Sequence, residues 1–85
     1  MKTLEDVIAS VDDVVNTRIT REPTPEGMRW RVELTSFTRE AQKLRSTTER
    51  RIGQGETILE AAEDAARAEP HRLIYLDAHH IATLP

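Results

Sequence analysis

Apolar residues recur at helical spacing near the start of the chain and alternate with polar residues in its middle. In residues 4–15 they fall three or four positions apart, which places them on one stripe of an amphipathic helix capped by Thr3. In residues 28–37 apolar and polar side chains alternate, a pattern typical of a strand buried on one side only. Residues 16–22 indicate an earlier strand, separated from it by a proline- and glycine-containing turn at residues 23–27.

The second half of the chain contains a strand that leads into a capped helix. Residues 44–52 alternate in polarity, which favours a hairpin through residues 38–43 and a third strand ending at Gly53. The good helix formers within residues 39–51 leave a helix open as the alternative. The pair Thr57 and Glu60 has the spacing of a capping box, with each side chain bonding the other's backbone N–H, and predicts a helix from Ile58 to Glu69.

The remaining pattern predicts a strand at residues 72–76, a turn at residues 77–80 and a short last strand at residues 81–84. The whole chain of 85 residues is expected to form one domain, residues 1–85. The predicted class is α+β, with two layers, an antiparallel sheet, helices on one face and the element order α-β-β-β-α-β-β. We expect one core that contains Val11, Trp30, Leu34, Ala62 and Leu73.

Composition narrows the classes of protein. The absence of cysteine removes disulfides and thiolate chemistry, which fits a reducing cytoplasm. The longest apolar run, residues 73–76, is far shorter than the roughly 20 residues of a membrane helix. Three aromatic residues in total argue against a platform that stacks nucleic-acid bases. We therefore expect a cytoplasmic protein that does not enter membranes.

Candidate catalytic and metal-binding residues are sparse. The histidines His71, His79 and His80 are too few and too adjacent to suggest a zinc site, and we expect them to be exposed. The serines lack the glycines of a nucleophile elbow, and the paired carboxylates are consecutive on predicted helices, so they diverge. The sequence thus predicts no enzyme, no catalytic residue, no metal and no cofactor.

One sequence feature resembles a known nucleic-acid-binding family. The segment with Gly53, Gly55, Thr57, Glu60 and Ala61, after a helix and three strands, is similar to the last helix of the double-stranded RNA-binding domain, and the likeness covers residues 3–69. That family binds phosphates with a lysine cluster at the start of this helix. The matching positions here are Ile58, Leu59, Glu60, Ala61 and Glu63. The resemblance therefore implies the fold but not RNA binding, because carboxylates repel phosphates.

Two further resemblances concern regulators. Residues 55–61 are similar to the helix that follows the strands of HicB-type antitoxins, although the DNA-binding tail usual in that family is missing here. The alanine-rich helix at residues 61–68 and the hairpin expected at residues 73–84 resemble those of small anti-CRISPR proteins of phages and mobile elements. This likeness, which also fits the chain's size, implies a non-enzymatic inhibitor that occupies a surface of a nucleic-acid-handling complex. The alternative is a nucleic-acid-binding or antitoxin-type regulator that uses a basic sheet face.

Charge is unevenly distributed, and it suggests two candidate surfaces. Residues 18–51 hold nine basic against five acidic residues, whereas both ends of the chain are acidic. The first candidate surface is the acidic helix, with Glu56, Glu60, Glu63 and Asp64 offered to a basic groove. The alternative is a basic sheet surface made of Arg29, Arg31, Arg45 and Arg51. We expect a host protein complex as partner, no direct binding to nucleic acid, and a monomer or homodimer.

Overall fold

The computed structural model of the chain describes residues 2–40, 42 and 44–76. Within these residues, two helices and four strands follow one another along the chain. Their bounds are α1 (Leu4–Ala9), β1 (Val14–Thr24), β2 (Gly27–Glu40), β3 (Arg45–Gly55), α2 (Ile58–Arg67) and β4 (His71–Leu76). The predicted α+β class is confirmed. The turn and last strand expected at residues 77–84, with His79 and His80, lie outside the described residues.

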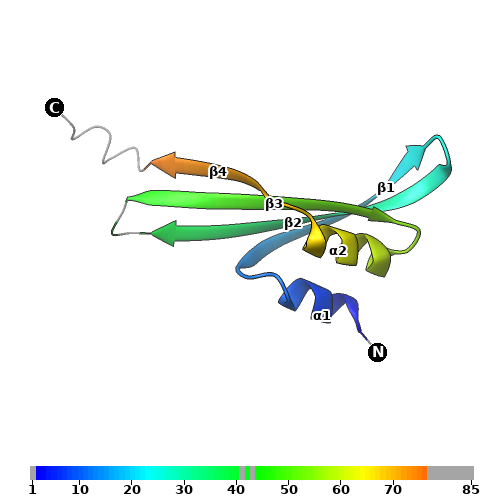
Figure 1. Cartoon of the computed structure of the whole chain (residues 1–85), viewed down its shortest axis with the longest axis horizontal. Coiled ribbons are helices and arrows are strands. Elements are labelled where there is room, and N and C mark those ends of the chain that lie inside the picture. Colours follow the sequence, from blue (N-terminus) through cyan, green and yellow to red (C-terminus); the bar gives the residue numbers. More distant parts are fainter. Residues whose placement is uncertain (1, 41, 43, 77–85) are drawn as a thin grey trace.

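The strands form one antiparallel sheet in the order β1-β2-β3-β4, so that strands adjacent in the chain are also adjacent in the sheet. Both helices lie on the same side of this sheet (Figure 1). We call that side the covered face, toward which Val32 and Leu34 point, and the other side the open face, which carries Glu33 and Thr35. The ends of β2 and β3 that meet at their hairpin, together with β4, run past the helices (Figure 1).

The core lies between the covered face and the two helices. Its buried apolar members are Val7, Val32, Leu34, Ala61, Ala62 and Ala65. The small alanine face of α2 allows a very close approach to the sheet. A Cβ atom added to Gly53 would run into the backbone of Ala61 and Ala65, and one added to Gly55 would lie 2.7 Å from the backbone nitrogen of Ala61. These contacts leave no space for any side chain at Gly53 or Gly55.

The first helix is shorter than predicted. It ends at Ala9 rather than at Val15, and Val14 already belongs to β1. The reason is local: the Ser10 hydroxyl donates to the carbonyl of Val7, and Asp13 adopts a left-handed conformation with φ 59°. The β-branched valines that follow then favour a strand, where they pack better than in a helix.

Of the two hydrogen bonds predicted for the capping box at the start of α2, only one forms as predicted. The backbone N–H of Glu60 donates to the Thr57 hydroxyl at 3.1 Å, as expected. The Glu60 carboxylate, however, accepts from the N–H of Glu56 at 3.2 Å instead of that of Thr57, so the reciprocal bond is displaced by one residue. The helix ends at Arg67, before the predicted Glu69, because Ala68 already has an extended ψ of 148°.

The hairpin between β2 and β3 confirms a third strand and excludes the alternative helix over residues 39–51. Its bounds differ from the prediction: β2 continues to Glu40, Leu44 lies in the turn with φ 51°, and β3 ends at Gly55 instead of Gly53. The predicted core is only partly correct. Leu34 and Ala62 are buried, and Val11 and Trp30 pack against the core at its margin. The prediction for Leu73 is wrong: Leu73 lies opposite Thr48, which lies opposite Phe37, and this row belongs to the open face.

Candidate functional site

The acidic residues of the second helix serve mainly to fix that helix to the sheet. The Asp64 carboxylate accepts the backbone N–H of Gln54 at 3.0 Å, and Glu60 binds the N–H of Glu56. The first bond joins α2 to β3, and the second closes the turn between β3 and α2. Glu63 is half-buried and lines a hollow next to α1. The four carboxylates proposed as a partner surface therefore do not act as one free cluster, since two of them already bind backbone groups.

The four arginines proposed as a basic surface are divided between the two faces of the sheet. Leu34 lies opposite Arg51, so Arg51 and Arg45 belong to the covered face, whereas Arg29 and Arg31 alternate with Trp30 and belong to the open face. The expectation that they share one surface needs correction. Each also has a carboxylate within 4.0 Å; these pairs are Arg29–Glu26, Arg31–Glu22, Arg45–Glu40 and Arg51–Glu49.

The open face instead presents a patch of large apolar side chains. Phe37, Leu73 and Tyr75 have exposed fractions of 44%, 42% and 55%. Phe37 and Leu73 flank Thr48 from either side, and Tyr75 follows Leu73 on the same side of β4, opposite Ser46. We call these three residues the apolar patch. Hydroxyl side chains of β3 fill the space between its members.

Charged side chains border the apolar patch and largely neutralise one another. Glu33 is buried on the open face and pairs with Arg50 at 2.9 Å and with Arg31 at 3.8 Å. A hollow of about 220 Å³ separates this ion pair from Leu73, with His71 on its rim. The open face thus combines an apolar area with a paired set of charges beside it.

Sequence reasoning missed the apolar patch, although one signal pointed to it. Within the alternating strand of residues 28–37, Phe37 falls on the side of the arginines and not on the side of Trp30. A phenylalanine among charged and hydroxyl residues on the wet side of a strand is a candidate contact residue.

Of the candidate metal ligands, only His71 lies within the described residues. Among the described residues no group of three histidine, cysteine, aspartate or glutamate side chains is arranged to hold a metal ion. His71 lies beside the arginine of the Glu33 ion pair, which is an unfavourable place for a cation. Neither helix in the described part of the chain is long and apolar enough to cross a membrane.

Comparison with known proteins gives no further guide. No family model, no curated protein and no solved structure matches this chain. A functional proposal must therefore rest on the residues and their geometry.

Proposed function

We propose that the chain is a non-enzymatic protein-binding module that contacts its partner through the open face. The observation that carries this proposal is the apolar patch, which exposes three large side chains of two strands on one face, with only hydroxyl side chains of β3 between the strands. Soluble proteins rarely expose a contiguous apolar area unless it binds something. Aromatic side chains beside arginines are also the composition that protein interfaces favour.

The charge arrangement favours a protein over a nucleic acid as the partner. Arg31 and Arg50 both pair with Glu33, and Arg31 also lies 3.6 Å from Glu22. Binding to phosphates needs cations that are free to replace counterions, and these arginines would first have to leave their carboxylates. An apolar protein surface with few charges matches the open face without breaking any of these pairs.

The finer proposal is that the partner is a nucleic-acid-handling defence complex in the host cytoplasm, and that the chain inhibits it as an anti-CRISPR protein does. The resemblance of its alanine-rich helix to such proteins supports this proposal. Inhibition by occlusion needs a tight surface contact and no chemistry, so the apolar patch would suffice. In this proposal the acidic residues of α2 are a secondary contact, because Glu60 and Asp64 already bind backbone groups.

A second candidate function is binding of single-stranded nucleic acid on the same face. One observation favours it: two of the three aromatic side chains, Phe37 and Tyr75, are exposed on the open face, where bases can stack on them. In this case the chain would be a nucleic-acid-binding or antitoxin-type regulator. The two candidates share a surface but differ in how their affinity depends on salt.

The test of both candidates is binding by a double variant of the patch. The wild-type chain, Phe37→Ser/Tyr75→Ser and the control Met28→Ser serve as baits in a bacterial lysate, and the captured proteins are identified by mass spectrometry. Met28 is equally exposed, at 51%, but belongs to the other face, so its change should leave capture intact. For a captured protein, calorimetry should show at least about tenfold weaker binding to the double variant.

Two results would count against the protein-binding proposal. One is that the double variant still captures the protein bound by the wild-type chain, or that Met28→Ser loses it to the same extent as the double variant. The other is submicromolar binding of fluorescent single-stranded DNA or RNA of random sequence at about 150 mM salt, with a steep fall at higher salt. That second result would make the nucleic-acid-binding regulator the leading candidate.

A further inference from the structure

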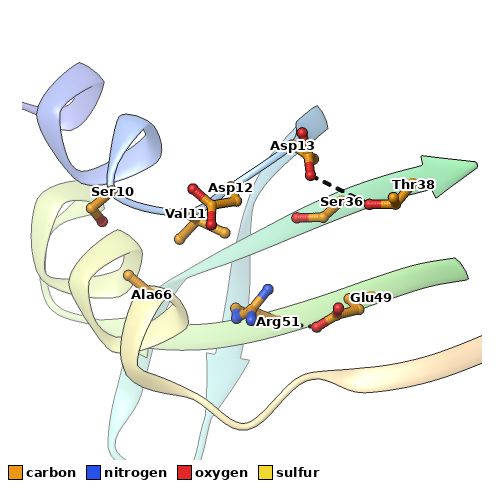
Figure 2. A pocket seen from close by; sticks show the side chains of 9 residues that line it. All are labelled: Ser10, Val11, Asp12, Asp13, Ser36, Thr38, Glu49, Arg51 and Ala66. Atoms are coloured by element: carbon orange, nitrogen blue, oxygen red, sulfur yellow. Dashed lines mark hydrogen bonds and ion pairs between the residues drawn. The ribbon is translucent and has the colours of Figure 1, made fainter.

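The covered face contains a polar cleft that the proposed function does not use. It has a volume of about 330 Å³ and lies where the loop after α1 faces the middle of β2 and β3. Figure 2 shows Asp12 and Asp13 along one side of this cleft and the side chains of Ser36 and Arg51 on the strands beneath them. The cleft and the apolar patch are on opposite sides of the sheet, so each can be tested without the other.

The floor of the cleft holds a polar group without a partner. The residue Ser36 is only 5% exposed, and its hydroxyl has no hydrogen-bond partner among the described residues. Its oxygen points toward the space between Val11, Asp12 and Arg51 (Figure 2). A buried hydroxyl without a partner costs free energy, because it has given up its bonds to water. A ligand group that bonds this hydroxyl would recover that cost.

The side of the cleft carries carboxylates that no cation of the described chain neutralises. Asp13 accepts a hydrogen bond from the Thr38 hydroxyl at 3.3 Å, but in the described part of the chain neither Asp12 nor Asp13 has a basic group within ion-pairing distance. Glu49, in contrast, is bound by Arg51 at 3.4 Å and by Arg72 at 3.5 Å. The unbalanced charge of the cleft is therefore negative and is concentrated on the two aspartates.

The kind of cation that fits is limited by the other lining residues. Arg51, although paired with Glu49, lines the cleft with a positive guanidinium, which repels a bare divalent ion about twice as strongly as a head group with a single charge. Val11 and Ala66 add an apolar wall. A cation that carries its own hydrogen-bond donors on an aliphatic stem can meet both surroundings, with donors toward the aspartates and the Ser36 hydroxyl and a stem along the apolar wall.

We propose that this cleft is a binding site for one basic side chain, a lysine or arginine, of a partner protein. The head group binds Asp12 and Asp13, the Ser36 hydroxyl bonds it from the floor, and the alkyl stem lies against Val11 and Ala66. The loop that carries the aspartates is held in place for this contact, because the N–H of Phe37 donates to the carbonyl of Asp13 at 3.2 Å.

The proposal is tested with isolated head groups. The ¹⁵N-labelled chain is titrated at low salt with N-acetyl-lysine methylamide, N-acetyl-arginine methylamide and, as the uncharged control, N-acetyl-norleucine methylamide. We expect saturable shifts of the amide signals of Asp12, Asp13, Ser36 and Thr38 with a basic probe, at millimolar concentrations as befits a single ion pair near water. The norleucine compound should leave these signals in place. The basic probe with the lower dissociation constant identifies the preferred side chain.

Variants separate the site from general electrostatics. Asp12→Asn/Asp13→Asn should weaken binding about tenfold, because it removes both carboxylates. Glu5→Gln/Glu69→Gln removes the same charge at exposed positions outside the cleft and should change binding less than about twofold. Ser36→Ala should weaken binding several-fold and at the same time raise the melting temperature, since it removes the unpaired hydroxyl. A merely structural serine would not combine these two effects.

The proposal is overturned by any of three results. These are the absence of saturable shifts with both basic probes, equal shifts with the norleucine compound, and an equal loss of affinity in the two double variants. Should Asp12→Asn/Asp13→Asn disturb the fold, the dispersion of its amide spectrum would show it. In that case Ser36→Ala tests the proposal, and an unchanged affinity of this variant for the basic probes would contradict the proposed contact.

Discussion

The two faces of the sheet are built from the same strands, yet they differ in what covers them. On the covered face, Leu34 is completely buried beneath the helices, whereas Phe37, three residues further along the same strand, is 44% exposed on the open face. The covered face is buried because small residues let α2 approach it, whereas neither helix of the described chain covers the large residues of the open face. A side chain's size alone thus does not decide its burial here.

The different lengths of the helices and the strands explain part of the difference in burial between the two faces. The helix α2 has 10 residues, or about 15 Å, whereas β2 has 14 residues, or about 46 Å. The helices therefore protect only one end of the sheet, and the hairpin end of β2 and β3 projects past them together with β4 (Figure 1). This projecting end carries the apolar patch. The comparison teaches that one end of the sheet is stabilised by the helices of the chain, while the other leaves large apolar side chains exposed, and the proposed partner contact rests on these.

The largest expected effect is the loss of the close approach between α2 and the sheet. Gly53→Ala should destabilise the chain by more than about 3 kcal/mol in urea denaturation, or prevent folding, because its Cβ would run into the backbone of Ala61 and Ala65. The matched control is Gly27→Ala. A Cβ atom added there would meet no atom within 4 Å beyond its chain neighbours, but the backbone has a φ of 116°. That strain alone should cost about 1–2 kcal/mol. A smaller loss for Gly53→Ala than for the control would contradict the packing of the covered face.

The next effect compares one leucine on each face. Leu34→Ala should cost about 2–5 kcal/mol, because it leaves a cavity beneath the helices. Leu73→Ala should cost less than about 1 kcal/mol, because solvent already reaches the side chain on the open face. Both values follow from the midpoints of urea unfolding. Similar losses for the two variants would mean that Leu73 is buried, as the sequence alone suggested.

The misassignment of Leu73 shows what a sequence pattern contains and what it lacks. Met28 to Leu34 alternate with polar residues, so the face of each residue in β2 was predictable. Residues 73–76 are all apolar, so no alternation of apolar and polar residues shows which of them face the helices and which face solvent. Only the register of β4 on β3, with Leu73 opposite Thr48, decides it.

The arginines were misplaced for a related reason. Which residues share a face across a hairpin depends on the number of residues in the connection. Glu40 lies opposite Arg45, so odd-numbered residues of β2 face even-numbered residues of β3. Arg31 is therefore on the same face as Arg50 and not Arg51. A loop different by one residue would have reversed this assignment, and loop length was the least certain part of the pattern. The cleft beneath Asp12 was likewise hidden, because it depends on how the loop after α1 meets β2.

A moderate effect is expected for the acidic residues of α2. Asp64→Lys should cost about 1–2 kcal/mol, because the N–H of Gln54 loses its acceptor and α2 loses a tie to β3. Glu63→Lys should cost much less, since the carboxylate of Glu63 takes no hydrogen bond within the described part of the chain. Thermal unfolding of both variants measures the difference. Equal stability of the two variants would contradict the role of the Asp64 carboxylate in tying α2 to β3.

The smallest effect concerns α1, the shorter of the two covering helices. Hydrogen bonding from the backbone N–H of Thr3, at 2.9 Å, and then from its side chain lowers the pKa of Asp6 below the ordinary value of 3.8. A carboxyl whose pKa is lower in the folded chain contributes stability that is fully present above its unfolded pKa. That contribution is lost as the pH falls through the folded pKa. At neutral pH the cap is therefore intact, and it weakens only in acid below about pH 4.

Substitution of the cap residue separates this effect from the rest of the fold. In Thr3→Gly the N–H remains but the hydroxyl is lost, so we expect the pKa of Asp6 to rise only part of the way, with the backbone bond still lowering it. A carbon-detected NMR titration of the Asp6 carboxyl in the wild-type chain and in Thr3→Gly measures this. A rise to the ordinary value would show that the hydroxyl, and not the backbone N–H, is the main cause. The amide signals of Val32 and Leu34 should be the same in Thr3→Gly as in the wild-type chain. The close packing of α2 on Gly53 and Gly55, which buries these two residues, does not involve Thr3.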